Sequence, residues 1–315
     1  MVSNSASSTN STPGNKSNNG ANGAGGVGSG KIKTYADLVM FGHSLFGLPF
    51  AYLGALLATR GMPAWPAWRD ILWITLAMLG ARNGANALNR LVDHEIDARN
   101  PRTANRHLPR GVVSRREVLA FSIGAFVLFA VSAWQLNTLC VRLLPIALAV
   151  MIAYSYTKRF TWASHFVLGF AVAMAPMGGW IAVRGSIELA TILLGLAAGS
   201  WVAGFDIIYA LQDIDFDRKE GLYSVPAKFG ADTALRISSL LHIVTLMALL
   251  GLYLELHLGA AYMIGVAISG TLLWYEHRLV SGADLSRIDT ASYTINQIIA
   301  PVLFTAAVID RLIRL

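Results

Sequence analysis

Asn89-Arg90-Leu91-Val92-Asp93-His94-Glu95-Ile96-Asp97 follows directly after an apolar stretch, and it decides how the rest of this 315-residue chain is interpreted. Asn89, Asp93 and Asp97 are spaced i, i+4 and i+8, so on a helix they share one face, one turn above the next. Glu95 lies off that face, where an ordinary solvated charge is expected. A solvated helix end would explain acidic residues in general, but it would not explain this spacing.

A second stretch, from Asp206 to Asp217, repeats the pattern. Tyr209, Asp213 and Asp217 are again spaced i, i+4 and i+8, and Asp206 lies one turn before Tyr209. Each acidic motif ends an apolar segment, where ionisable side chains are costly and usually functional. Carboxylates that face each other at low dielectric repel strongly. They therefore need protons, arginines or a divalent metal to neutralise them.

The faces of both motifs offer only oxygen ligands, without Cys or His. Such a donor set favours a hard cation, and so Mg²⁺ over Zn²⁺. Mg²⁺ typically takes one or two carboxylates and completes its coordination with water and phosphate oxygens. The paired motifs therefore predict a magnesium-dependent site for a substrate that carries phosphate.

Basic residues near the two motifs support the same interpretation. Arg102 and Arg106 lie in the loop after the first motif, and Lys158 and Arg159 follow another apolar segment. Guanidinium groups suit phosphate oxygens. Anchoring at the membrane surface is the alternative for each of these residues, and for Lys158 and Arg159 it explains the sequence equally well. Arg82 is different because it lies inside an apolar span, two turns before Asn89, where a cation is expensive.

The composition is that of an integral membrane protein. Hydrophobic residues make up 55% of the chain, only 14% are charged against roughly 25% in soluble domains, and the mean hydropathy is +0.52. A single cysteine excludes an intramolecular disulfide. The net charge of +7 is distributed as expected for membrane orientation and an anionic ligand, so no nucleic-acid partner is predicted.

The sequence predicts an all-α fold, a bundle of nine transmembrane helices, since only helices satisfy the backbone in lipid without closing a barrel. Each apolar segment is near the ~20 residues that span hydrocarbon. The predicted segments are 36–59, 69–92, 116–136, 139–157, 163–183, 188–213, 232–255, 258–277 and 291–312. Residues 35–315 form this membrane domain, and residues 1–34, rich in Ser, Asn and Gly, are predicted to be a disordered cytoplasmic tail.

The distribution of lysine and arginine predicts the orientation. Most of the 25 basic residues fall in the tail and in the segments that lie on its side of the membrane. The positive-inside rule then places the N-terminus and both acidic motifs in the cytoplasm, with the chain crossing a plasma membrane many times. Two acidic motifs at one membrane surface predict one shared site.

Taken together, these motifs resemble the UbiA family of membrane prenyltransferases, over roughly residues 35–315. The resemblance rests on the two acidic motifs, on Arg102-Thr103-Ala104-Asn105-Arg106-x-Leu108-Pro109-x-Gly111, and on Tyr154-Ser155-Tyr156-Thr157-Lys158-Arg159. It implies nine helices around a cavity, Mg²⁺, and transfer of a polyprenyl group from polyprenyl diphosphate to an acceptor.

The resemblance also implies roles for individual residues. Catalytic and diphosphate-binding residues would be Asn89, Asp93, Asp97, Asp213 and Asp217, of which the four aspartates would bind the metal. Phosphates would be held by Arg102, Arg106, Lys158 and Arg159. Arg82 would lie near the acceptor or the diphosphate, and Asp206 and Tyr209 would support the site.

The resemblance leaves the acceptor of the prenyl group undecided. The chain looks most like the 4-hydroxybenzoate branch, which implies an aromatic acid acceptor in ubiquinone or menaquinone biosynthesis. A branch that prenylates a naphthoate in the futalosine route to menaquinone is also similar, in the pair Asn89-Arg90, in Pro101-Arg102-Thr103-Ala104, and in the run from Phe46 to Tyr52. Haem O, chlorophyll and archaeal ether-lipid synthases share the aspartates and remain alternatives.

Two other classes of protein fit the sequence less well. An ion-coupled transporter also has charged groups inside a helix bundle, but these usually lie near the midplane and within inverted repeats. Here the two motifs are similar in parallel and lie at the membrane surface. A structural membrane subunit gives no reason for so many ionisable groups.

Overall fold

The computed structural model describes residues 34–314 except 36, 39, 40 and 63, without the side chains of 41–46. The predicted tail therefore lies outside the described residues, apart from Thr34. In the described part, nine helices have at least 18 residues and no strand occurs. These helices are α2 (Phe41–Ala58), α3 (Trp68–Val92), α5 (Arg115–Leu136), α6 (Thr138–Thr157), α7 (Ser164–Arg184), α8 (Leu189–Tyr209), α11 (Ala231–Glu255), α12 (Ala260–Leu279) and α13 (Asn296–Ile313).

The all-α prediction is confirmed, and each predicted segment corresponds to one long helix. Six of the nine are long and apolar enough to cross a membrane, namely α5, α6, α7, α8, α11 and α13. The fold is thus that of a multi-pass membrane protein. That α2, α3 and α12 also cross, which would make nine crossings, stays a prediction.

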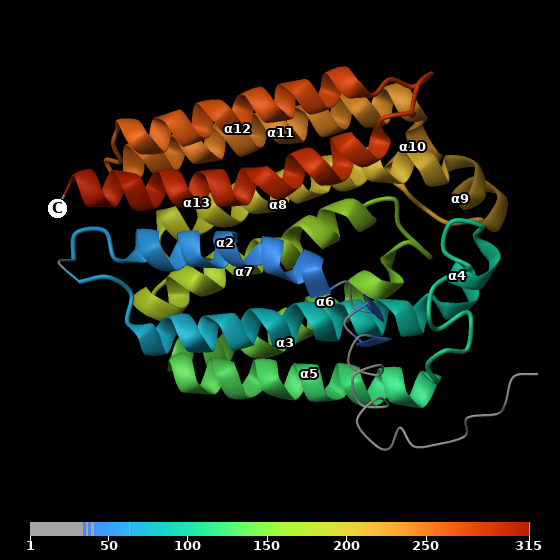
Figure 1. Ribbon diagram of the computed structural model, residues 1–315, viewed down its shortest axis with the longest axis horizontal. Coiled ribbons are helices and arrows are strands. Elements are labelled where there is room, and N and C mark those ends of the chain that lie inside the picture. The colour runs from blue at the N-terminus through green and yellow to red at the C-terminus, as the bar shows by residue number, and fades with distance from the viewer. Residues whose placement is uncertain (1–33, 36, 39–40, 63, 315) are drawn as a thin grey trace, which may run out of the picture.

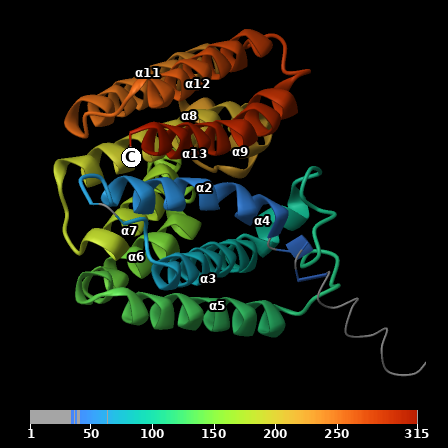
Figure 2. The ribbon, with the colours of Figure 1, turned by 60° about the vertical axis from the view of Figure 1, so that its left-hand side comes forward.

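The long helices lie side by side along the longest axis of the molecule (Figure 1). In both views α11 and α12 form one edge of the bundle, α5 lies at the opposite edge, and α2 and α7 lie between them (Figure 2). The short helices α4 (His94–Arg99), α9 (Ile214–Glu220) and α10 (Val225–Phe229) gather at one end, away from the C-terminus. Both acidic motifs lie at that end.

Glycines allow the central helices to approach closely. A Cβ on Gly54 of α2 would lie 2.0 Å from the backbone oxygen of Pro176, and one on Gly179 of α7 would lie 2.1 Å from that of Ala51. Both distances are far below van der Waals contact, so only glycine fits at either position. Small residues at helix contacts are the usual means of close packing in membranes. This packing fixes α2 against α7 in the middle of the bundle.

Asn137 forms the tight turn between α5 and α6. Its side-chain oxygen accepts a hydrogen bond from the backbone N–H of Cys140 and so caps α6. Its amide nitrogen donates to the carbonyls of Ile181 and Ala182 in α7, at 2.7 and 3.1 Å. The turn is therefore attached to a neighbouring helix.

Two boundaries differ from prediction. The predicted segment 291–312 begins with a π-helix, η2 (Thr290–Ile295), before α13. The segment 188–213 was expected to be one helix, but α8 ends at Tyr209 and a 3₁₀ turn, η1 (Ala210–Asp213), precedes α9. A tighter 3₁₀ turn is a common ending for an α-helix. The first motif is interrupted likewise, because Asp93 separates α3 from α4.

The middle aspartate of each motif has almost the same backbone geometry. Asp93 has φ −87° and ψ 5°, and Asp213 has φ −104° and ψ 5°. These values lie in the sparsely populated bridge region, where active-site residues are often found. Around Asp93 the i to i−4 hydrogen bonds continue, from Asp93 to Asn89 at 2.9 Å and from Asp97 to Asp93 at 2.7 Å. Each motif therefore has an irregular residue at its middle aspartate, and both irregular residues lie at the same end of the bundle.

Candidate active site

The two acidic motifs contact each other through the loop after α4. Asn100 donates from Nδ2 to Oδ1 of Asp213 at 3.1 Å. Arg102 donates from Nε and Nη2 to the two oxygens of Asp213, at 3.1 and 2.6 Å, and from Nη1 to the hydroxyl of Tyr209 at 2.8 Å. Such paired bonds between guanidinium and carboxylate are strong and directional. The loop of the first motif is therefore held on the second.

Arg102 keeps its charge in this position. Burial alone would lower its pKa, but the hydrogen bonds and the negative charge of Asp213 outweigh burial and raise it. A permanently charged guanidinium at the mouth of the site is available for an anionic ligand.

Asp93 is the most enclosed carboxylate of the site, with 3% of its surface exposed. Its Oδ2 lies 2.5 Å from Nζ of Lys158 and its Oδ1 lies 3.0 Å from Nη2 of Arg159. Asn89 donates to Oδ2 at 3.2 Å. Arg159 is itself fixed by bonds to the carbonyls of Val92 and Ser155. A buried carboxylate is thus neutralised by two partly exposed cations.

Asp97 and Asp217 complete the set of aspartates. Asp97 is 4% exposed, and Nη1 of Arg106 donates to both of its oxygens at 2.7 Å. Asp217 accepts a hydrogen bond from Ser224 at 2.8 Å. Glu95, by contrast, has 80% of its side chain exposed, as expected for a residue off the motif face.

All four aspartates line one polar cavity of about 180 Å³. The same cavity is lined by Asn89, Arg102, Arg106, Lys158, Asp206 and Tyr209. The structure therefore brings these predicted site residues together. Arg159 contacts the site through Asp93, and Arg82 lies deeper.

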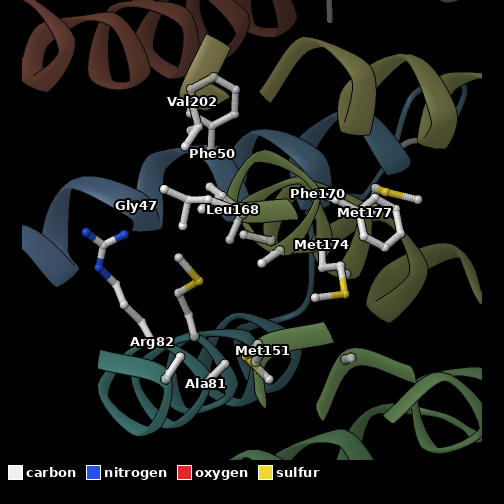
Figure 3. Close-up of a pocket in the computed structure, with 18 of the residues that line it drawn as sticks. Gly47, Phe50, Ala81, Arg82, Met151, Leu168, Phe170, Met174, Met177 and Val202 are labelled. Carbon is white, nitrogen blue, oxygen red and sulfur yellow. The ribbon is translucent and has the colours of Figure 1, made fainter. Parts of the chain in front are cut away.

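Beside the polar cavity lies a larger apolar cavity of about 560 Å³. Its walls include Phe50, Met151, Leu168 and Phe170 (Figure 3). Arg82 projects into it from α3, and its Nε is buried without a hydrogen-bond partner among the described residues. A guanidinium in an apolar wall with one buried nitrogen left unbonded is costly and points to an anionic ligand.

The two cavities are adjacent. Asn89, Tyr154, Asp206 and Tyr209 line both of them. A ligand that fills both cavities would therefore place its charged end among the aspartates and cations and its apolar end inside the bundle.

The donor set of the polar cavity fits Mg²⁺. Its four aspartates offer the carboxylate oxygens that Mg²⁺ prefers, and Oδ1 of Asp93 is buried with only the ion pair to Arg159 beside it. In the described part of the chain, however, no three acidic, histidine or cysteine side chains converge as a ready metal site. Three of the four aspartates pair with Lys or Arg instead. A phosphate ligand would have to draw these cations away before the carboxylates could bind a metal.

Sequence reasoning missed two residues of the site. Asn100, which bridges to Asp213, stands directly before the Pro101-Arg102 run and had no spacing signal of its own. His165 lines the polar cavity and contacts Asp206. A histidine at the start of an apolar span was a signal that could have been used.

The geometry defines a class of protein, a multi-pass helical membrane protein with an ionic site that opens into an apolar chamber. The model of the UbiA prenyltransferase family matches residues 47–298, and the chain belongs to that family. It is a membrane prenyltransferase.

Curated relatives and solved structures agree with this assignment. The chain is 33% identical over 232 residues to the 4-hydroxybenzoate octaprenyltransferase of Vibrio cholerae serotype O1, covering 71% of this chain and 78% of that protein. The enzyme of the same name from Vibrio parahaemolyticus is 30% identical over 258 residues, covering 79% and 88%.

Among solved structures, the apo form of a UbiA homologue from Aeropyrum pernix K1 superposes with a TM-score of 0.78 at 32% identity, covering 85% of this chain and 98% of that one. A UbiA homologue from Archaeoglobus fulgidus, solved with GPP and Mg²⁺, gives 0.70 at 19% identity over 88% and 99% of the two chains. At that identity the likeness shows the fold alone.

Proposed function

We propose that this chain transfers a polyprenyl group from polyprenyl diphosphate to an aromatic acid, with Mg²⁺, in quinone biosynthesis. The first candidate for the acceptor is 4-hydroxybenzoate. The observation that carries the proposal is the junction of a 180 Å³ ionic cavity with a 560 Å³ apolar one, which suits a diphosphate joined to a hydrocarbon tail. The names of the curated relatives support the same reaction.

The cations of the polar cavity would bind the diphosphate. Arg102, Arg106 and Lys158 are each about a third exposed and lie 2.5–2.7 Å from aspartate oxygens. They can turn from carboxylate to phosphate without leaving the cavity. Their charges would then stabilise the negative charge that builds up on the leaving diphosphate, an effect that is usually large in catalysis.

The carboxylates freed by that exchange would hold the metal. Asp93, Asp97, Asp213 and Asp217, with Asn89, supply the oxygen ligands. Bound Mg²⁺ would neutralise phosphate charge and favour departure of the diphosphate. The bond from Asn100 to Asp213 and the bond from Arg102 to Tyr209 would keep the two motifs together while the cations and the metal change partners.

Arg82 would bind the carboxylate of the acceptor. Its guanidinium lies in the apolar cavity, and Arg82 does not line the polar cavity that holds the four aspartates. An aromatic acid held by its carboxylate could present its ring to the first carbon of the prenyl chain. The hydroxyl of the acid makes that ring electron-rich, so the ring attacks as the C–O bond of the diphosphate breaks.

The apolar cavity would hold the prenyl chain and exclude water. Its walls are largely Leu, Met, Phe and Ala side chains, which cannot capture an allylic cation as water would. The resulting C–C bond joins the acid to the isoprenoid tail.

We place the protein in the plasma membrane, and the distribution of basic residues supports an orientation with the N-terminus and the site facing the cytoplasm. The loops at the end that carries α4, α9 and α10 are the arginine- and lysine-rich ones. A water-soluble acid and a diphosphate head group would then reach the site from the cytoplasm.

A naphthoate acceptor is the second candidate, on the evidence of the sequence around the first motif. The Asn89-Arg90 pair adds Arg90 to Arg102 and Arg106 in the polar cavity, and Nη1 of Arg90 lies 4.0 Å from Oδ2 of Asp97. A bicyclic acid would also bind Arg82 through its carboxylate, but it would fill more of the junction between the two cavities.

The test uses the purified full chain in lipid nanodiscs with Mg²⁺ and radiolabelled polyprenyl diphosphate. Offered 4-hydroxybenzoate and hydroxynaphthoates in parallel, the protein should prenylate an acid and release diphosphate. Product with 4-hydroxybenzoate supports the first candidate, and product with a naphthoate alone supports the second. If no aromatic acid is prenylated while the diphosphate binds, the proposed acceptor class is wrong.

A further inference from the structure

His165 and Asp206 form a pair at the junction of the two cavities, in which His165 is buried and 24% of the Asp206 side chain is exposed. His165 lies in the first turn of α7 and is 5% exposed. Its Nδ1 lies 2.7 Å from Oδ2 of Asp206 on α8. His165 lines the polar cavity, and Asp206 lines both. The roles proposed above for the aspartates and cations leave this pair without a task.

Helix packing holds the pair in place. Gly169, one turn after His165, approaches α8 so closely that a Cβ would lie 2.3 Å from the backbone oxygen of Gly199. Asp206 lies two turns after Gly199, on the same face of α8. The close approach of α7 and α8 therefore brings the imidazole to the carboxylate, and neither side chain needs an unusual reach.

The second ring nitrogen of His165 is the unusual feature. Nε2 is buried and has no hydrogen-bond partner among the described residues. A buried polar atom without a partner costs free energy, and each one calls for an explanation. Since Nδ1 faces a carboxylate, it is the nitrogen that carries the proton in the neutral ring, which leaves a lone pair on Nε2.

We propose that His165 is the base that removes the ring proton of the acceptor, with Asp206 as its positioning residue; this inference rests on the proposed function. When the prenyl carbon bonds to the ring, the electron pair of the broken C–O bond leaves with the diphosphate. The attacked ring carbon then carries both a hydrogen and the prenyl group. Nε2 takes that hydrogen as a proton, and the C–H electron pair returns to the ring and restores aromaticity.

The surroundings favour His165 over the other ionisable groups of the site. Asp93, Asp97 and Asp213 are paired with cations and are the proposed metal ligands. Asp206 carries a charge that stabilises the imidazolium formed by proton transfer, as a buried carboxylate does for a catalytic histidine elsewhere. The pair also lies beside the apolar cavity, where the ring of the acceptor is expected.

The experiment separates a base from a structural histidine. His165→Asn retains a donor at the position of Nδ1, and so its bond to Asp206, but has no atom at Nε2. His257→Asn is the control, because His257 is exposed at the opposite end of the bundle and its φ of 48° suits asparagine. Each variant and the wild type are assayed in nanodiscs with Mg²⁺, geranyl diphosphate, and 4-hydroxybenzoate with hydrogen or deuterium on both carbons beside the hydroxyl-bearing one.

We expect His165→Asn to lower kcat by about 10²-fold or more, the usual contribution of a general base. KM for geranyl diphosphate should stay within about twofold of the wild-type value, since diphosphate binding does not involve this residue. Proton removal should become rate-limiting, so the deuterium isotope effect should rise from near unity in the wild type to clearly above it in the variant. The control should match the wild type in all three measurements.

Three outcomes would overturn the inference. Unchanged kcat in His165→Asn would mean that Nε2 takes no proton. A raised KM for geranyl diphosphate, with no isotope effect, would make His165 a diphosphate ligand. A wild-type protein that prenylates neither 4-hydroxybenzoate nor a naphthoate would refute the proposed function and this inference with it, whereas the first two outcomes leave the proposed function intact.

Discussion

Replacing Asp93 with Asn tests the role of the most deeply buried carboxylate of the site. The substitution keeps the shape of the side chain and removes one negative charge. In the structure that charge is 3% exposed and neutralises Lys158 at 2.5 Å and Arg159 at 3.0 Å. The variant therefore leaves two cations without their main counter-charge and removes one oxygen ligand of the proposed metal.

The effect on stability should be moderate. Losing one partner of a fully buried pair costs 3–5 kcal/mol and exposed pairs contribute under 1 kcal/mol, so with both cations about a third exposed we expect roughly 2 kcal/mol. Total stabilities of about 5–15 kcal/mol leave the variant folded. Thermal unfolding followed in detergent should show a decrease in Tm of several degrees at most.

The effect on catalysis should be larger. Removing one preorganised group that stabilises developing charge typically lowers kcat by about 10²–10³-fold. We expect a loss of this size for Asp93→Asn at saturating Mg²⁺, measured as transfer of a labelled prenyl group to 4-hydroxybenzoate by the purified protein in nanodiscs. Asp213→Asn should show a similar loss, since the second motif is the partner of the first.

Asp215→Asn is the matched control. Asp215 lies between Asp213 and Asp217 in the sequence but is exposed and does not line the polar cavity. It should retain wild-type kcat, which separates a site effect from a general change in charge. If Asp93→Asn is folded and transfers the prenyl group at half the wild-type rate or better, the reasoning about the acidic motifs is refuted.

Three further predictions follow from single contacts. Arg102→Lys should raise KM for the prenyl diphosphate about tenfold, because lysine cannot make the paired bonds that Arg102 makes with Asp213 or with phosphate; an unchanged KM would contradict this. Arg82→Leu should raise KM for the aromatic acid by roughly 10–100-fold, the loss of one charged hydrogen bond, while KM for the diphosphate stays constant; equal effects on both would place Arg82 elsewhere. Gly54→Ala should destabilise the bundle by about 1–3 kcal/mol through overpacking, whereas Gly178→Ala, with open space around its Cβ, should not change Tm.

The sequence alone determined the class of fold and most of the residues of the site. Apolar segments of membrane-spanning length are a local property, so the long helices could be predicted without knowing their neighbours. The same holds for Asn89, Asp93 and Asp97, because a spacing of four residues places side chains on one face wherever the helix lies. Arg82 was evident from the cost of a cation within an apolar segment.

Only the tertiary structure decided how these residues combine. The bonds from Asn100 and Arg102 to Asp213 join positions more than a hundred residues apart. They depend on which helices pack together, which no local pattern encodes. The pairing of aspartates with cations depends on the same packing.

The 3₁₀ turn that ends α8 at Tyr209 also came from the fold, since the predicted segment ran as one helix to residue 213. The partnership of His165 with Asp206 was decided by the close approach of α7 and α8 at Gly169. Local periodicity thus determined which side chains share a helix face. Long-range packing determined which faces meet, because the distance between two helices is set by the residues at their contact and not by the motif itself.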